Sequence, residues 1–274
     1  MQRLLSVSQI TILLLYVLAV AALIMHRLPN YAARSRPLFS GATILAAAAM
    51  LLHGQLLAAE IFHDDGMRIT MAGAVSLIGL QLALIGLIGT MESSLRGMSA
   101  GLLALAAFAS LATNYSSATE TTVDPSWQIQ AHILISLFAY GLLTVGCIIA
   151  IYALIQDRRL RSGRLSAANH LFAPLETTEK MLFGVATSGF VVLLLAVVSG
   201  FAFVDNLFAQ HLVHKTVLSL LALALFGILV AGRQFAGWRG KRAVYLYLWG
   251  FAFLFLAYFG SRFILEQLLG RSWS

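Results

Sequence analysis

Long apolar stretches recur along this 274-residue chain and constrain its fold more than any other feature. An α-helix needs about 20 apolar residues to cross the ~30 Å hydrocarbon core of a bilayer. By that measure the sequence predicts an all-α, polytopic membrane helical bundle of about eight transmembrane helices. The spans cover residues 9–25, 38–59, 70–91, 97–113, 129–156, 181–204, 212–232 and 243–265, of which the fourth is short and the fifth is long enough to tilt.

Composition excludes the main soluble classes. Hydrophobic residues make up 60% of the chain and charged residues only 11%, whereas about a quarter of the residues in a soluble domain are charged. A soluble core of this size could not cover so much apolar surface. A soluble enzyme, a nucleic-acid-binding domain and a disordered chain are therefore excluded, and we expect no nucleic acid partner despite the net charge of +7.

The basic residues predict an orientation. Lys and Arg concentrate in the segments after the first, third, fifth and seventh spans, most of all in 157–180 and 233–242. Basic loops stay on the cytoplasmic side, so both termini are predicted to face the periplasmic side. The loop 157–180 is the one candidate internal boundary, and we otherwise interpret 1–274 as a single integral membrane domain.

The histidines are the most informative polar residues. Four of the seven lie near the predicted outer ends of spans, and they are His53, His132, His211 and His214. His211 and His214 are three residues apart, which places them on one helical face. Imidazole is the commonest protein ligand of haem iron, so the set indicates a ligand site. For each histidine alone, an interfacial or hydrogen-bonded role is the alternative.

Three charged residues could support such a site. Glu60 follows His53 by seven residues and could accept a hydrogen bond from an imidazole, or it could be an interfacial carboxylate. Lys215 and Arg262 are candidate cations for haem propionates. Their alternative partners are Asp205 for Lys215 and Glu266, four residues on, for Arg262.

Motifs for catalysis or covalent cofactor attachment do not occur in the sequence. It contains no G-x-S-x-G or H-E-x-x-H motif and no phosphate-binding loop. Its single cysteine, Cys147, excludes both an intrachain disulfide and a CxxCH haem attachment motif. We therefore expect a protein that is not an enzyme, with no catalytic residues and no metal beyond haem iron.

Several ordered blocks resemble a known family. The stretch WQIQAHILISLFAYG, residues 127–141, resembles the helix of CcsA-type cytochrome c assembly proteins in which a histidine is followed by a Ser-x-x-x-Tyr pattern. The later blocks SGFAFVDNLFAQHLVHKTVLS and GWRGKRAVYLYLWGFAFLFLAYFGSRF are similar to the inner-membrane YpjD branch of that family. The resemblance spans nearly the whole chain and is strongest over 127–263.

The resemblance implies a multi-pass protein of the bacterial inner membrane that holds haem b near the periplasmic face for cytochrome maturation. Its implied partners are membrane lipid and apocytochrome c or other cytochrome assembly proteins. By position, His132 matches the first outer haem-ligating histidine of the family. A span-seven histidine, His211 or His214, would then supply the other ligand, with His53 as an inner or transient one.

The chain departs from the family pattern at three places. The tryptophan-rich loop is replaced by LFAQHLVHKT, the histidine expected near the inner end of span seven is replaced around Gly232, and 261–274 lacks the second outer histidine. A second function class therefore stays open, namely a non-haem accessory or structural subunit of a membrane transporter complex on the same fold. A small-solute transporter is disfavoured because the intramembrane charges are few and lie near one face.

Overall fold

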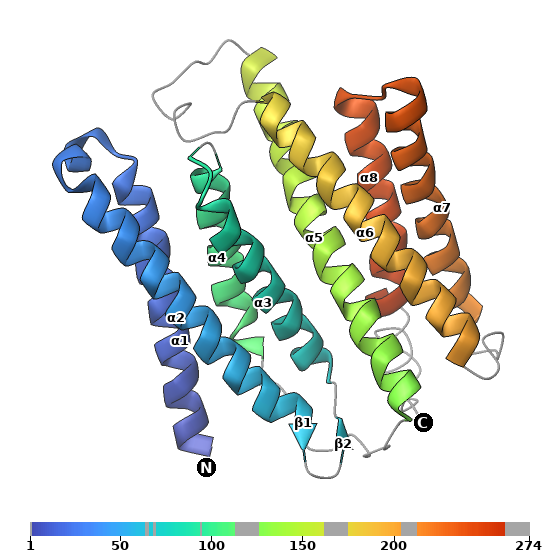
Figure 1. The fold of residues 1–274 in the computed structure, drawn as a ribbon, viewed down its shortest axis with the longest axis horizontal. Coiled ribbons are helices and arrows are strands. Elements are labelled where there is room, and N and C mark those ends of the chain that lie inside the picture. Colours follow the sequence, from blue (N-terminus) through green and yellow to red (C-terminus); the bar gives the residue numbers. More distant parts are fainter. Residues whose placement is uncertain are drawn as a thin grey trace. The chain divides into compact units, whose positions relative to one another are not determined.

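The computed structural model describes residues 2–63, 66–67, 70–93, 95–112, 126–161, 175–203 and 213–260. Within these residues the fold is helical (Figure 1). The helices are α1 (Gln2–His26), α2 (Ser35–Ile61), α3 (Met71–Gly89), α4 (Arg96–Ala109), α5 (Trp127–Arg161), α6 (Leu175–Phe203), α7 (Val213–Ala236) and α8 (Gly240–Phe255). The short elements are the 3-10 helix η1 (Pro29–Arg34), the paired strands β1 (Phe62–His63) and β2 (Gly66–Met67), and the π-helical turn η4 (Leu256–Gly260).

Each predicted span coincides with one of these helices, which confirms the helical membrane bundle. In the part of the chain that the structure describes, the helices α1, α2, α3, α5, α6 and α7 are long and apolar enough to cross a membrane. Helix α4 has 14 residues, in keeping with the short fourth span, and α8 has 16. The count of eight crossings and the periplasmic position of the termini stay predictions.

The chain divides into two compact units. The first comprises Met1–Ser126 with Gly163–Pro174, and the second comprises Trp127–Ser162 with Leu175–Ser274. The expected internal boundary within 157–180 was wrong, because α5 packs along α6 and α8 and so belongs with the helices that follow it. That 1–274 forms a single membrane domain stays a prediction.

The first unit is a ring of four helices in which α1 contacts α2 and α4, and α3 contacts the same two (Figure 1). Small residues, Gly86 and Gly89, let α3 and α4 approach closely. A Cβ atom added at Gly86 would lie 3.2 Å from the Cβ of Leu102, and one added at Gly89 would lie 2.6 Å from the Oγ of Ser99. Larger residues at these two positions would push the helices apart.

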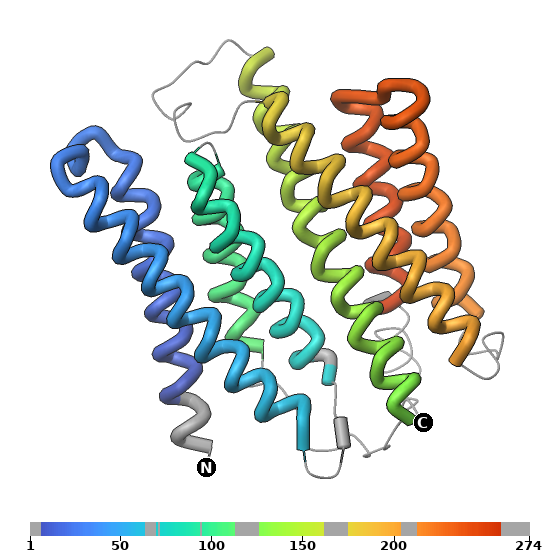
Figure 2. The backbone as a smooth tube through the Cα atoms, viewed as in Figure 1, coloured from blue at the N-terminus to red at the C-terminus, as the bar shows by residue number. Residues whose placement is uncertain are grey.

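The second unit repeats this neighbour pattern, since α5 contacts α6 and α8, and α7 contacts the same two. Helices α7 and α8 form a hairpin whose turn contains Gly237 and Gly240, both at a φ of 62°, where glycine carries no Cβ penalty (Figure 2). Because the helices alternate in direction, the start of α5, the end of α6, the start of α7 and the turn η4 meet at one end of the unit. The candidate site lies at this end.

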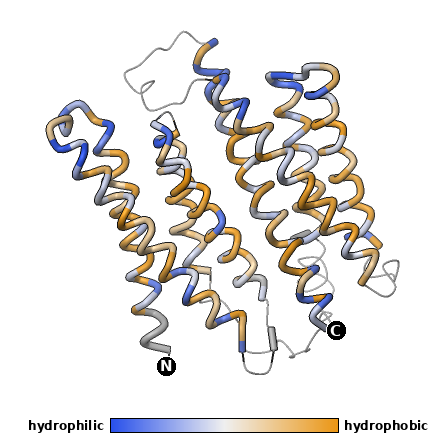
Figure 3. Tube along the Cα trace, in the orientation of Figure 1, coloured by the Kyte–Doolittle hydropathy of each residue, from blue (hydrophilic) through white to orange (hydrophobic). Residues whose placement is uncertain are grey.

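The surface is apolar along the helices. Hydrophobic residues predominate along the middle of each helix, and hydrophilic residues are concentrated toward the helix ends (Figure 3). Large apolar side chains stay exposed, such as Ile44 at 68% and Val198 at 56%. Lipid tails accept such a surface without cost, whereas the hydrogen bonds within each helix satisfy its backbone.

Candidate functional site

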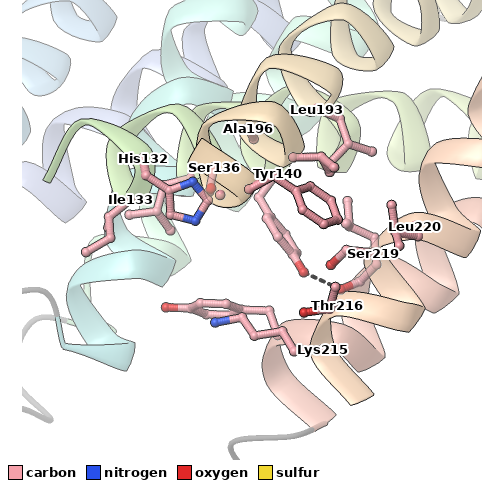
Figure 4. Close-up of a pocket in the computed structure, with 16 residues that line it drawn as sticks. His132, Ile133, Ser136, Tyr140, Leu193, Ala196, Lys215, Thr216, Ser219 and Leu220 are labelled. Carbon is pink, nitrogen blue, oxygen red and sulfur yellow. Dashed lines mark hydrogen bonds between the residues drawn. The ribbon is translucent and has the colours of Figure 1, made fainter. Parts of the chain in front are cut away.

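A cavity of about 270 Å³ lies within the second unit, at the end where α5 begins. Its volume is close to the lower end of the range of roughly 300–1,000 Å³ for small-molecule sites. Apolar side chains from α5, α6 and α7 form most of its walls (Figure 4). The side chains with polar groups on these walls include His132, Ser136, Tyr140, Lys215, Thr216 and Ser219.

One face of α5 supplies the first wall. His132, Ser136 and Tyr140 are spaced four residues apart, so they lie along one helical face, and all three line the cavity. They are the residues of the family-like histidine and Ser-x-x-x-Tyr pattern. The buried hydroxyl of Tyr140 donates a hydrogen bond to the carbonyl of Leu254, next to the turn η4. This bond anchors the wall to α8.

The His132 ring is held against α6. Its Nδ1 atom lies 2.9 Å from the Oγ of Ser199, and that Oγ lies 2.9 Å from the carbonyl oxygen of Ala196. Gly200 makes the close approach possible, because a Cβ added there would lie only 3.1 Å from the Cε1 of His132. The hydrogen bond of the His132 ring to Ser199 uses Nδ1, so Nε2 is the nitrogen through which the ring could bind a ligand.

A cation lies on the opposite wall. The Nζ of Lys215 is 5.2 Å from the centre of the Tyr258 ring, and both residues line the cavity. This is a cation–π arrangement across α7 and η4. The alternative partner considered for Lys215, Asp205, lies outside the described residues.

Of the other residues predicted for this site within 175–274, the structure describes only His214. His214 is exposed and does not line the cavity, while His211 and Arg262 lie outside the described residues. Over the described ranges, no group of three or more His, Cys, Asp or Glu side chains could hold a metal ion. The structure therefore brings His132 and Lys215 together, and the roles of His211, His214 and Arg262 stay predictions.

His53 belongs to the first unit and is fully buried there. Its Nδ1 lies 3.3 Å from the hydroxyl of Tyr16 and its Nε2 lies 2.8 Å from the Oγ of Ser76. The structure thus gives His53 a hydrogen-bonded role, which is one of the alternatives to a ligand role. Ligation of iron by His53 would require one of these two bonds to break. Neither of these bonds involves Glu60. The Oε1 atom of Glu60 is buried and has no hydrogen-bond partner among the described residues.

At the other end of the second unit, aromatic packing replaces the histidine that the family pattern would place near Gly232. The Trp238 indole lies directly against Gly232, closer than any added Cβ would allow, and its backbone N–H donates to the Gly232 carbonyl at 3.0 Å. The Arg242 guanidinium stacks 3.8 Å from the centre of the Trp238 ring. The side chains that the structure places next to Gly232 are therefore a tryptophan and the arginine stacked on it.

Sequence reasoning missed Ser199 and Gly200 on α6, and on α7 it found Lys215 but missed Thr216 and Ser219. Ser199 and Gly200 stand 67 and 68 positions from His132 along the chain, and no periodicity connects residues on separate helices. The block SGFAFV within the family resemblance contains both residues and was the one available signal. Ser219 follows Lys215 by four residues and Thr216 by three, which could have marked it as a neighbour of both on the helix surface.

Comparison with known proteins identifies the family of this chain. The family model described as "Cytochrome C assembly protein" matches residues 5–269. Inner membrane protein YpjD of Escherichia coli strain K12 is 31% identical over 237 residues, covering 83% of this chain and 87% of that protein. An uncharacterized 28.8 kDa protein of Azospirillum brasilense is 30% identical over 171 residues, covering 62% of this chain and 63% of the relative. No solved structure matches. The chain belongs to the cytochrome c assembly protein family.

Proposed function

We propose that this protein binds haem b in the cavity of the second unit and holds it for cytochrome c maturation. The observation that carries the proposal is the position of His132 on the wall of an apolar cavity, with its Nδ1 bonded to Ser199. Imidazole nitrogen is a common axial ligand of haem iron, and apolar walls suit a porphyrin. Haem bound there would supply an iron centre whose ligands can be exchanged.

Several residues of the cavity have the chemistry that would hold a haem. His132 offers a single axial nitrogen, and Ile133, Leu137 and Val197 offer apolar contacts. The ammonium of Lys215 offers a charge for a propionate, with the hydroxyl of Ser219 also on the walls. A second ligand would come from His211, outside the described residues, or from a partner.

The protein's own part in this function would be to bind, orient and release. Its family membership supports a role in cytochrome assembly, with apocytochrome c or other assembly proteins as partners. We place it in the bacterial inner membrane with both termini on the periplasmic side, in line with the printed name of its Escherichia coli relative and the distribution of basic residues. No catalytic turnover of its own is part of the proposal.

Absorption spectroscopy tests the proposal. The protein purified in detergent, or reconstituted with hemin, should show a Soret band that shifts on reduction. His132→Ala should lose that band, while His214→Ala, which changes an exposed histidine away from the cavity, should keep most of it. A colourless protein that takes up no hemin would exclude the proposal.

Two observations favour the second candidate, a non-haem accessory or structural subunit of a membrane transporter complex. Among the described residues, His132 is the one histidine on the cavity, and Trp238 packing occupies the region near Gly232. Under this alternative the wild-type protein and His132→Ala would be equally colourless and equally stable. Co-purification of the intact protein with a transporter from the native membrane would support it.

A further inference from the structure

The hydroxyl of Ser199 on α6 contacts two groups at once. Its Oγ lies 2.9 Å from the carbonyl oxygen of Ala196 and 2.9 Å from the Nδ1 of His132. Ser199 is 9% exposed, so water has little access to replace either contact. A hydroxyl carries one proton, and it can therefore donate to only one of these two neighbours.

The Ala196 carbonyl decides which neighbour receives the proton. A carbonyl oxygen can only accept, so a contact of 2.9 Å with Oγ is favourable only when Ser199 donates. The imidazole of His132 can carry its proton on either nitrogen, and the bond made by one nitrogen sets the state of the other. All three groups are satisfied in one arrangement, in which His132 donates from Nδ1 to the Oγ of Ser199.

We infer that Ser199 is a positioning residue that holds His132 as the Nδ1–H tautomer, leaving Nε2 unprotonated at the cavity. In the opposite arrangement Ser199 would donate to Nδ1, two acceptor oxygens would face each other at 2.9 Å, and Nε2 would carry a proton. Only an unprotonated nitrogen can bind a metal. A partner that takes up the second N–H of a ligating imidazole also fixes the orientation of the ring.

The assignment of the tautomer depends only on the hydrogen bonds, whereas its role in haem ligation rests on the proposed function. The first test therefore uses ligand-free protein in detergent with ¹⁵N-labelled histidine, at about pH 8.5 so that an ordinary histidine with a pKa near 6.5 is neutral. His132→Gln identifies the signals of His132. We expect a protonated Nδ1 and an unprotonated Nε2. A protonated Nε2 as the major form would overturn the inference.

Two serine variants on the same helix separate positioning from general effects. Ser199→Ala removes the acceptor and should raise the ratio of the Nε2–H to the Nδ1–H form of His132 by roughly 2- to 10-fold, the range that one net hydrogen bond gives. Ser188→Ala is the matched control, because the Ser188 hydroxyl donates to the Gly184 carbonyl at 3.0 Å and has no contact with His132. An unchanged ratio in Ser199→Ala, or an equal change in both variants, would contradict the inference.

Hemin titration of the same two variants tests the purpose. Ser199→Ala should raise the hemin dissociation constant by roughly 10- to 100-fold, the usual cost of losing a partner behind a metal ligand, while Ser188→Ala should leave it unchanged. If the wild-type protein binds no hemin, the proposed function fails and the tautomer result still stands. If hemin binds equally to both variants, the proposed function stands and the positioning role fails.

Discussion

The ammonium group of Lys215 lies 5.2 Å from the centre of the Tyr258 ring, so the first turn of α7 contacts the π-helical turn that follows α8. Such π-helical turns are rare and are found frequently at functional sites. Here the turn places an aromatic face beneath a cation, and both line the cavity that contains His132. The cavity therefore has an imidazole on one wall and a positive charge on another.

Replacing Lys215 by methionine should weaken hemin binding and keep the fold. A charge-assisted hydrogen bond to a propionate contributes about 1.5–3 kcal/mol, so we expect the dissociation constant to rise by roughly tenfold or more. Lys241→Met is the control, because Lys241 pairs with Asp157 at 3.2 Å and does not line the cavity. Equal hemin affinity of Lys215→Met and the wild type would remove Lys215 from the site.

Gly200→Ala should disturb the imidazole directly. The added Cβ would lie 3.1 Å from the Cε1 of His132, so either the ring or α6 must shift. Crowding of this kind costs typically 1–3 kcal/mol, and the displaced ring should bind hemin several-fold more weakly. Gly184→Ala on the same helix is the matched control, since no side chain or backbone atom lies within 4 Å of its added Cβ. If both alanine variants bind hemin like the wild type, the ring is not held at Gly200.

His53→Gln should destabilise the first unit without changing the haem spectrum. His53 joins Tyr16 and Ser76 across three helices, and the substitution leaves buried polar groups with poorer partners. We expect a loss of about 1–3 kcal/mol in the free energy of unfolding, measured by denaturant unfolding in detergent. A Soret band lost in His53→Gln as fully as in His132→Ala would instead establish His53 as a ligand.

Gly146→Ala should destabilise the second unit. The ring of Tyr247 packs directly on Gly146, and its hydroxyl donates to the Leu143 carbonyl at 2.9 Å in a fully buried position. A methyl group at residue 146 would displace the ring and lengthen that bond, at a cost of about 1–3 kcal/mol. Thermal unfolding in detergent compares it with Gly184→Ala, which should unfold at or slightly above the wild-type temperature. Equal unfolding temperatures for Gly146→Ala and the wild type would contradict this packing.

The helices could be predicted because the ability to cross a bilayer depends on the length and apolar character of each segment by itself. Apolar length located α5 and the short α4 to within a few residues. The division into units was missed because it depends on which helices pack together. The long basic loop lies between α5 and α6 in the sequence, yet these two helices pack against each other in one unit.

The sequence could relate residues of the site to one another only when they lie on the same helix. His132, Ser136 and Tyr140 form one face by spacing, whereas Ser199 joins them through tertiary packing. His26 shows the same limit. Its Nδ1 lies 2.7 Å from the Oγ of Ser35 and its Nε2 accepts from Arg96, 70 positions away, at 3.1 Å.

The measurement that tests the central claim most directly is hemin binding by His132→Gly with and without added imidazole. The account predicts that the glycine variant loses the Soret band of the wild type and that free imidazole restores it, because the small ligand can occupy the vacated space beside Ser199. His214→Gly should keep the band without imidazole. A Soret band in His132→Gly that equals the wild-type band before any imidazole is added would contradict the account.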